Sequence, residues 1–124
     1  MQSIVRTVRV WSLIIVLFLV AQLSAWAHAF LYYSIPAVGS VITNSPPAVI
    51  ICFTEHLGDH GSIIQVRNAK DKEVDNKDSH RDFKDLSLLK VSLPALPPGR
   101  YKVFWKALSV DGHQTQGHFQ FTIK

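Results

Sequence analysis

The chain has 124 residues, a formal net charge of +4 and a single cysteine. Residues 28–124, which follow a basic and apolar first segment, hold eleven Lys and Arg against nine Asp and Glu, so their charge is nearly balanced. That balance gives no support to nucleic-acid binding, which is typical of strongly basic domains. Cys52 has no partner for an intrachain disulfide, and its apolar neighbours predict a buried, unreactive thiol.

Residues 1–27 have the pattern of an export signal. Two arginines precede an apolar core at 11–21, and the triplet Ala-Trp-Ala at 25–27 fits the small-x-small cleavage site. We therefore expect cleavage after this triplet and a mature chain that begins with His28. The alternative is a retained membrane anchor, because 10–27 is an uncharged run near the minimum length that spans a bilayer. An uncleaved chain would keep the α-nitrogen of His28 in a peptide bond and away from any metal.

The 97 residues from 28 to 124 suffice for one domain with its own hydrophobic core. Short apolar segments alternate there with proline and glycine, and no long stretch has helical period. Six strands are expected at 29–34, 48–54, 62–67, 86–93, 100–108 and 118–124. A further element between the first two ends at the Ser-Pro-Pro of 45–47. About seven short strands in this length favour an all-β fold, a small antiparallel Greek-key sandwich or barrel of immunoglobulin-like type.

Two further segments carry expectations of their own. In 100–108, Tyr101, Val103 and Trp105 share one face, so Trp105 is expected in the core between two sheets. Residues 68–85 are densely charged and poor in large apolar side chains. This composition predicts a solvated loop or a ragged exposed hairpin.

Asp111 and His113 lie two residues apart in the predicted connection between the last two strands. Alternate side chains of an extended chain share a face, so both could meet one metal ion, and Gly112 between them lets the backbone bend. His28, as the first residue, would add an imidazole and a free α-amine, whose reference pKa of about 7.7 to 8.0 lets a metal displace its proton near neutral pH. Cu(II) favours such nitrogen and carboxylate ligands, whereas structural zinc usually takes a closed, cysteine-rich set. The hypothesis is one Cu(II) ion per chain, bound by His28, Asp111 and His113.

Each part of this site also has a simpler explanation. An Asp-Gly pair is common in turns, and a histidine can begin a mature chain by chance. The other histidines and one carboxylate are assigned no direct role. His56, His60 and His80 lie in predicted loops and are expected to be solvated, while His118 could at most orient a ligand from behind. Glu55 ends a buried strand and either orients an imidazole or faces water.

Five stretches of the chain, taken together, indicate membership of a known family. They are His-Ala-Phe-Leu at 28–31, Ser-Ile-Pro-Ala-Val-Gly-Ser at 34–40, Phe-Thr-Glu at 53–55, Pro-Gly-Arg-Tyr-Lys-Val-Phe-Trp at 98–105, and Ser-Val-Asp-Gly-His at 109–113 with Gly117, Phe119 and Phe121. In this order they resemble the CopC family of periplasmic copper-resistance proteins, which includes PcoC-like and YobA-like members. The resemblance spans nearly all of 28–124.

The resemblance implies a seven-stranded Greek-key barrel or sandwich and a Cu(II) site made by His28, Asp111 and His113. It also implies a periplasmic carrier or store that is not an enzyme and has no small-molecule substrate. Such a carrier would sequester copper or pass it to an inner-membrane transporter of the CopD type. Some family members hold Cu(I) in a methionine-rich loop, but the only methionine here is Met1. No methionine-based Cu(I) site is therefore expected.

Two other functions fit parts of the sequence. An N-terminal histidine is also the mark of copper oxidases of the histidine-brace type. Against an oxidase, Asp111 would fill a coordination position that an oxygen-activating site leaves open, and the short chain offers little surface for a polysaccharide. The other alternative is an immunoglobulin-like interaction module that binds no metal, in which His28 is incidental.

Overall fold

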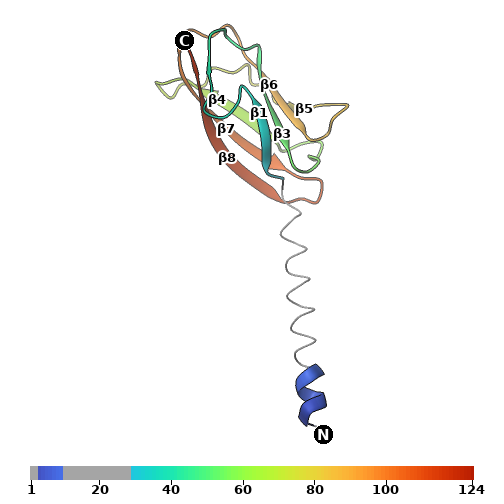
Figure 1. The fold of residues 1–124 in the computed structure, drawn as a ribbon. Helices are drawn as coiled ribbons and strands as arrows, with labels where there is room; N and C mark the ends of the chain where they lie inside the picture. The colour runs from blue at the N-terminus through green and yellow to red at the C-terminus, as the bar shows by residue number, and fades with distance from the viewer. Residues whose placement is uncertain (1–2, 10–28) are drawn as a thin grey trace.

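The computed structural model describes residues 3–9 and 29–124. Residues 3–9 are helical, and this short helix lacks the length and apolar character needed to cross a membrane. Residues 29–124 fold into two four-stranded sheets (Figure 1). The predicted export signal falls mostly outside the described residues.

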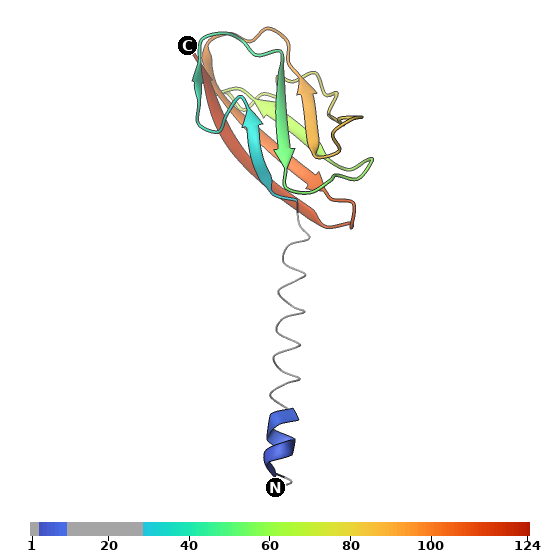
Figure 2. The ribbon, with the colours of Figure 1, turned by 45° about the vertical axis from the view of Figure 1, so that its right-hand side comes forward.

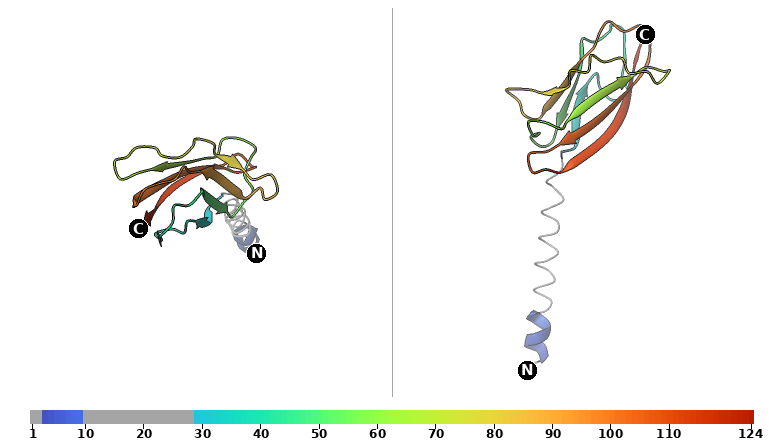
Figure 3. Two further views of the ribbon diagram at one scale, coloured as in Figure 1. Left: turned by 90° about the horizontal axis from the view of Figure 1, so that it is seen from above. Right: turned by 180° about the vertical axis from the view of Figure 1, so that it is seen from behind.

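One sheet has the strand order β1-β3-β6-β5 and the other the order β2-β8-β7-β4. The strands are β1 (Leu31–Ile35), β2 (Val41–Ile42), β3 (Ala48–Phe53), β4 (Ile63–Arg67), β5 (His80–Arg81), β6 (Leu88–Ser92), β7 (Gly99–Leu108) and β8 (Gln114–Ile123). All neighbours pair antiparallel except β2 and β8, which run parallel. Figure 3 shows the second sheet from behind, with β4, β7 and β8 side by side. The predicted all-β sandwich is confirmed.

Alternation along the strands places the core between the sheets. On β7, Tyr101, Val103 and Ala107 are buried, and on β8 the buried side chains are Phe119, Phe121 and Ile123. They meet residues of the other sheet in one apolar cluster, which includes Val49, Ile51, Phe53, Leu89 and Val91. Burial of a side chain of this size contributes about 1.5 to 3 kcal/mol, so the alternating pattern both selects the strand and stabilises the sandwich.

Trp105 packs against this core without being fully enclosed. Its ring lies edge-on to Phe53, with the ring centroids 5.2 Å apart. Across the ladder it faces Gly117, where an added Cβ would come within 2.6 Å of the indole. The expected core position is therefore correct, and a glycine on the next strand makes room for it. Cys52 is buried as a free thiol, as expected.

The last strand is longer than its hydropathy suggests. The sequence predicts a start at His118, but β8 begins at Gln114 and pairs with β7 along its whole length, from Leu108 opposite Gln114 to Gly99 opposite Ile123. The first residues of β8 escape prediction because backbone pairing with β7, and not apolar alternation, holds them extended.

The charged segment 68–85 is more ordered than the solvated loop that its composition allows and is nearer to the alternative, a ragged hairpin, because Glu73 bridges antiparallel to Arg67 at the end of β4. Its residues run along the open edge of β4: Asp75, which is buried, accepts a hydrogen bond from the N–H of Val66 at 2.8 Å. The Ser79 hydroxyl both accepts from the N–H of Ile64 and donates to its carbonyl, each at 3.0 Å. These bonds satisfy the edge of the sheet and protect it from pairing with another strand. The segment then forms β5, which pairs with β6 of the other sheet.

Candidate metal centre

The hairpin loop between β7 and β8, residues 109–113, lies at one end of the sandwich (Figure 2). Ser109 is buried, and its N–H donates to the carbonyl of His113 at 3.0 Å. The N–H of Gly112 donates back to the carbonyl of Ser109 at 3.0 Å. Gly112 has φ +88°, a left-handed conformation that a glycine adopts without strain. The loop is therefore closed by its own backbone bonds and presents the side chains at 111 and 113 together.

The two side chains meet as the sequence expects. His113 Nδ1 lies 3.0 Å from Asp111 Oδ2, and the backbone N–H of His113 donates to Asp111 Oδ1 at 3.2 Å. The Ser109 hydroxyl donates to the same Oδ1. The side chains remain accessible, with exposed fractions of 36% for Asp111 and 53% for His113. Ser109 and the backbone of the loop thus hold the pair on its buried side, while its other side is open to solvent.

These hydrogen bonds also set the charge of the carboxylate. The Ser109 hydroxyl first, and then the His113 ring and backbone N–H, lower the pKa of Asp111 to about 2. Each of these donors stabilises the ionised form, so Asp111 is an anion throughout the neutral range. An anion held against an imidazole is a favourable environment for a cation.

The distance between the two atoms suits metal chelation. Nitrogen and carboxylate oxygen ligands lie about 2.0 to 2.2 Å from a divalent metal such as zinc. Two such ligands at right angles around one ion are separated by roughly 2.8 to 3.1 Å. Nδ1 of His113 and Oδ2 of Asp111, at 3.0 Å, already have this separation. A metal ion bound between these two atoms would therefore need little movement of either side chain.

His28 lies outside the described residues, but the residues that follow it are well fixed. Ala29 is fully buried, and its carbonyl accepts a hydrogen bond from the hydroxyl of Thr115 at the start of β8. Phe30 donates its N–H to the Thr54 hydroxyl at 3.0 Å and accepts from the Thr54 N–H at 2.8 Å. The chain that precedes β1 is thereby attached beside the β7–β8 hairpin, two residues along β8 from His113.

No other described histidine side chain joins Asp111 and His113 in a metal-binding group. His118 is on the outer face of β8 beside the Phe104 ring, at 5.9 Å between centroids, and His60 and His80 line a separate hollow. His56 contributes its backbone carbonyl to the hairpin, accepting from the N–H of Val110 at 3.1 Å. Among residues 3–9 and 29–124, no group of three or more His, Cys, Asp or Glu side chains is arranged to hold a metal ion.

Two supporting residues escaped the sequence analysis. The sequence identifies Ser109 only as part of a motif, although a serine hydroxyl can form hydrogen bonds with nearby groups of the chain. Thr115 gives no signal of its own, because its partner is the carbonyl of a residue 86 positions away. Only the fold reveals that contact.

Comparison with known proteins supports a copper-related role. The model of the CopC domain matches residues 31–124. Protein YobA of Escherichia coli K12 is 35% identical over 102 residues, covering 82% of each chain. Copper transport protein CutJ of Bacillus subtilis 168 is 31% identical over 115 residues, which cover 91% of this chain and 21% of CutJ.

A solved structure agrees with these sequence matches. The crystal structure of CopC from Methylosinus trichosporium OB3b superposes with a TM-score of 0.74 at 27% sequence identity, and it covers 78% of this chain and 94% of that one. Residues 31–124, which the CopC domain model matches, contain both sheets and the hairpin that carries Asp111 and His113. Family model, relative and fold agree, and the chain belongs to the CopC family of copper-resistance proteins.

Proposed function

We propose that the mature protein begins at His28 and binds one Cu(II) ion in the periplasm. Its ligands are the α-amine and imidazole of His28, the carboxylate of Asp111 and the imidazole of His113. The observation that carries this proposal is the Asp111–His113 pair, in which an ionised carboxylate lies 3.0 Å from an imidazole nitrogen on an exposed hairpin. Three nitrogens and one oxygen form the kind of ligand set that Cu(II) prefers.

The anchoring of Ala29 supports the inclusion of His28. Consecutive Cα atoms are 3.8 Å apart, so a first residue cannot lie far from a second residue that is buried and hydrogen-bonded. The hydroxyl that holds Ala29 belongs to Thr115, two residues from His113. Cleavage after Ala27 would therefore release the α-amine close to the hairpin pair.

The accessibility of the pair supports a carrier that binds and releases copper without turnover. Both side chains are partly exposed, so an ion held there can exchange with a partner. The periplasmic donor or acceptor we propose is an inner-membrane copper transporter of the CopD type. The match to 21% of the copper transport protein CutJ supports this, because it places a similar domain within a longer chain of that name.

A competitive Cu(II) titration against a chelator tests the ligand assignment. Asp111→Asn and His113→Ala should each weaken Cu(II) binding by more than about tenfold, because even residues behind a metal ligand typically contribute 10- to 100-fold. His118→Ala is the matched control, since it removes an exposed β8 histidine that lies away from the hairpin. The electron paramagnetic resonance spectrum should lose one nitrogen coupling only in His113→Ala.

Two results would contradict the assignment. One is wild-type affinity in both hairpin variants. The other is an equal loss in the His118→Ala control, which would indicate non-specific binding to surface histidines.

A further inference from the structure

The outer face of the β2-β8-β7-β4 sheet is basic and contains no acidic side chain on its three longer strands. Because side chains alternate, the partners of the buried residues on these strands point outward. The outward positions are Ile63, Gln65 and Arg67 on β4; Arg100, Lys102, Phe104, Lys106 and Leu108 on β7; and Gln114, Gln116, His118, Gln120 and Thr122 on β8. We call this set the basic face. It holds cations and amides in a protein whose charge is otherwise nearly balanced.

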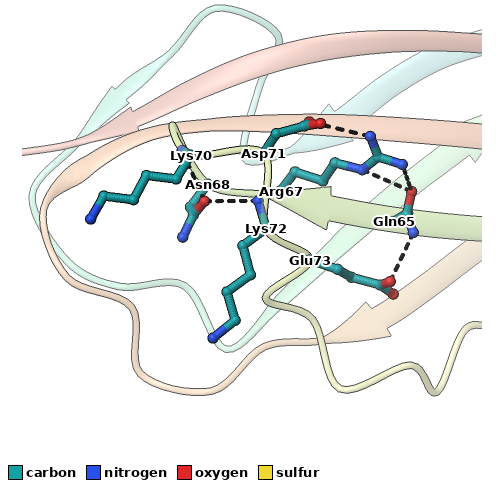
Figure 4. A network of polar contacts seen from close by, with 7 residues as sticks. All are labelled: Gln65, Arg67, Asn68, Lys70, Asp71, Lys72 and Glu73. Atoms are coloured by element: carbon teal, nitrogen blue, oxygen red, sulfur yellow. Dashed lines mark hydrogen bonds and ion pairs between the residues drawn. The ribbon is translucent and has the colours of Figure 1, made fainter.

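Arg67 is the cation of the basic face that forms an ion pair within the described residues. Its guanidinium bonds to Asp71 at 3.2 Å and to the Gln65 side chain at 2.8 and 3.1 Å (Figure 4). It also lies over the Phe104 ring, 4.9 Å from the centroid. Glu73, the other nearby carboxylate, accepts a hydrogen bond from Gln65 at 2.8 Å. Both acidic neighbours thus lie in the loop that borders β4 and are already engaged.

The other three cations of the basic face have weaker contacts: Lys102 Nζ lies 5.8 Å from the centroid of the Phe104 ring, and Asp71 lines the same hollow as Arg100 and Lys102. Within residues 3–9 and 29–124, Arg100, Lys102 and Lys106 form no ion pair. They lie on one strand at alternate positions, and from 100 to 106 they span roughly 20 Å. Three cations without an ion pair on one face of a strand produce a local positive potential that would attract an anionic partner.

The basic face also contains two hollows that are large enough to hold side chains of a partner. A hollow of about 470 Å³ is lined by Phe104, Trp105, Lys106 and residues of the neighbouring strands. A second hollow of about 400 Å³ is lined by Arg100, Lys102 and Gln120 on the strands and by Asp71 of the bordering loop. The two hollows follow β7, and each contains at least one lysine and one glutamine.

We propose that the basic face docks an extended acidic segment of a partner protein, laid along β7. Its carboxylates, at every second or fourth residue, would pair with Lys102, Lys106 and Arg100. The amides of Gln116 and Gln120 can donate to and accept from its backbone. A membrane surface fits less well, because Phe104 is half-buried beneath Arg67 and cannot insert as an apolar anchor.

This docking surface is separate from the proposed copper ligands but shares two strands with them. The hairpin loop that carries Asp111 and His113 joins β7 to β8, and it begins at Ser109, three residues after Lys106. A partner laid along β7 would therefore end next to the hairpin. The proposal does not depend on copper binding, and the two can fail independently.

The test uses a fluorescent ten-residue peptide of alternating Glu and Ala and the chain from His28 onward, followed by fluorescence anisotropy at low salt. The peptide should bind, and its affinity should decrease as sodium chloride is added. Lys106→Glu and Lys102→Glu should each weaken binding at least about fivefold, because each removes an attraction and adds a repulsion. Lys84→Glu is the matched control: it makes the same charge change at an exposed lysine outside the basic face that belongs to none of the ion pairs among the described residues.

Three results would overturn the proposal: no binding of the peptide at low salt, an equal loss in Lys84→Glu, or binding of phosphatidylglycerol vesicles without binding of the peptide. Cu(II) titration of Lys106→Glu should match the wild type. A failure of Cu(II) binding in the wild type would overturn the copper site and leave the peptide result intact.

Discussion

At the scale of single residues, Ser109 determines how the hairpin presents its carboxylate. Its buried hydroxyl donates to Asp111 Oδ1 and lies 3.1 Å from the carbonyl of His113. With Oδ1 occupied, Oδ2 is the oxygen turned toward the His113 ring. A residue that touches no metal can in this way fix the geometry of two ligands.

Ser109→Ala should therefore raise the pKa of Asp111 toward the usual carboxyl value and weaken Cu(II) binding by roughly 10- to 100-fold. NMR titration of the Asp111 carboxyl measures the first effect and chelator competition the second. Ser62→Ala is the matched control, because its hydroxyl accepts from the N–H of Leu108 at 2.9 Å and does not touch Asp111. An unchanged Asp111 titration in Ser109→Ala would show that the hydroxyl has no such role.

The low pKa of Asp111 gives a prediction for pH. A pKa of about 2 means that this carboxylate carries no proton at pH 5 or at pH 7. Free imidazoles and α-amines, with reference values of about 6.5 and 7.7 to 8.0, must lose protons to bind a metal. Cu(II) affinity should fall as the pH is lowered from 7 to 5, and the slope of this fall should be the same in Asp111→Asn. A slope smaller by one proton in the variant would mean that Asp111 binds a proton in this range.

At the scale of the elements, the β7–β8 pair depends on a close fit between Trp105 and Gly117. An added Cβ at 117 would lie 2.6 Å from the indole, which Phe53 contacts from the other sheet. Gly117→Ala should lower the free energy of unfolding by about 1 to 3 kcal/mol, because the ring has to shift within a packed layer. Urea denaturation followed by tryptophan fluorescence measures this loss.

Gln116→Ala, at the neighbouring outward position, is the control for that substitution. It should change the free energy of unfolding by less than about 0.5 kcal/mol. Equal stability of Gly117→Ala and wild type would show that the indole can move freely, which the packing against Phe53 contradicts.

Asp82, in the connection between β5 and β6, should make the free energy of unfolding depend on pH. Lys90 donates to Asp82 at 2.8 Å, and this bond together with backbone N–H groups lowers the pKa of Asp82 well below its usual value. The folded protein therefore releases this proton more readily than the unfolded chain, whose carboxyl titrates near 3.9. The resulting stability is present above about pH 4 and is lost as the pH falls through the folded-state pKa.

Asp82→Asn should thus be less stable than wild type at pH 6, and the difference should narrow as the pH falls below about 4. Urea denaturation at several pH values measures it. Lys90→Gln removes the other half of the pair and should give the same convergence. A difference that stays constant with pH would attribute the loss to packing instead of charge.

At the scale of the whole molecule, sequence reasoning succeeds where the signal is local. Alternation along β7 predicts which face is buried, and the two-residue spacing of Asp111 and His113 predicts that they meet. It fails where the cause lies far away in the chain. The contact of Thr115 with Ala29 and the cover that Asp75 provides for β4 depend on residues brought together only by folding. The composition of the charged segment predicts a solvated loop or a ragged hairpin, and it gives no sign of the bonds that the segment makes to the edge of β4.

The central claim is that the mature N-terminus completes the metal site. The most direct test is a competitive Cu(II) titration, with electron paramagnetic resonance, of the chain that starts at His28 and of the same chain with one extra residue before it. The account predicts a large loss of affinity and a changed nitrogen pattern in the extended form, because its His28 nitrogen is an amide and cannot bind copper as an amine. Equal affinity and equal spectra for the two forms would contradict the claim and remove the α-amine from the site.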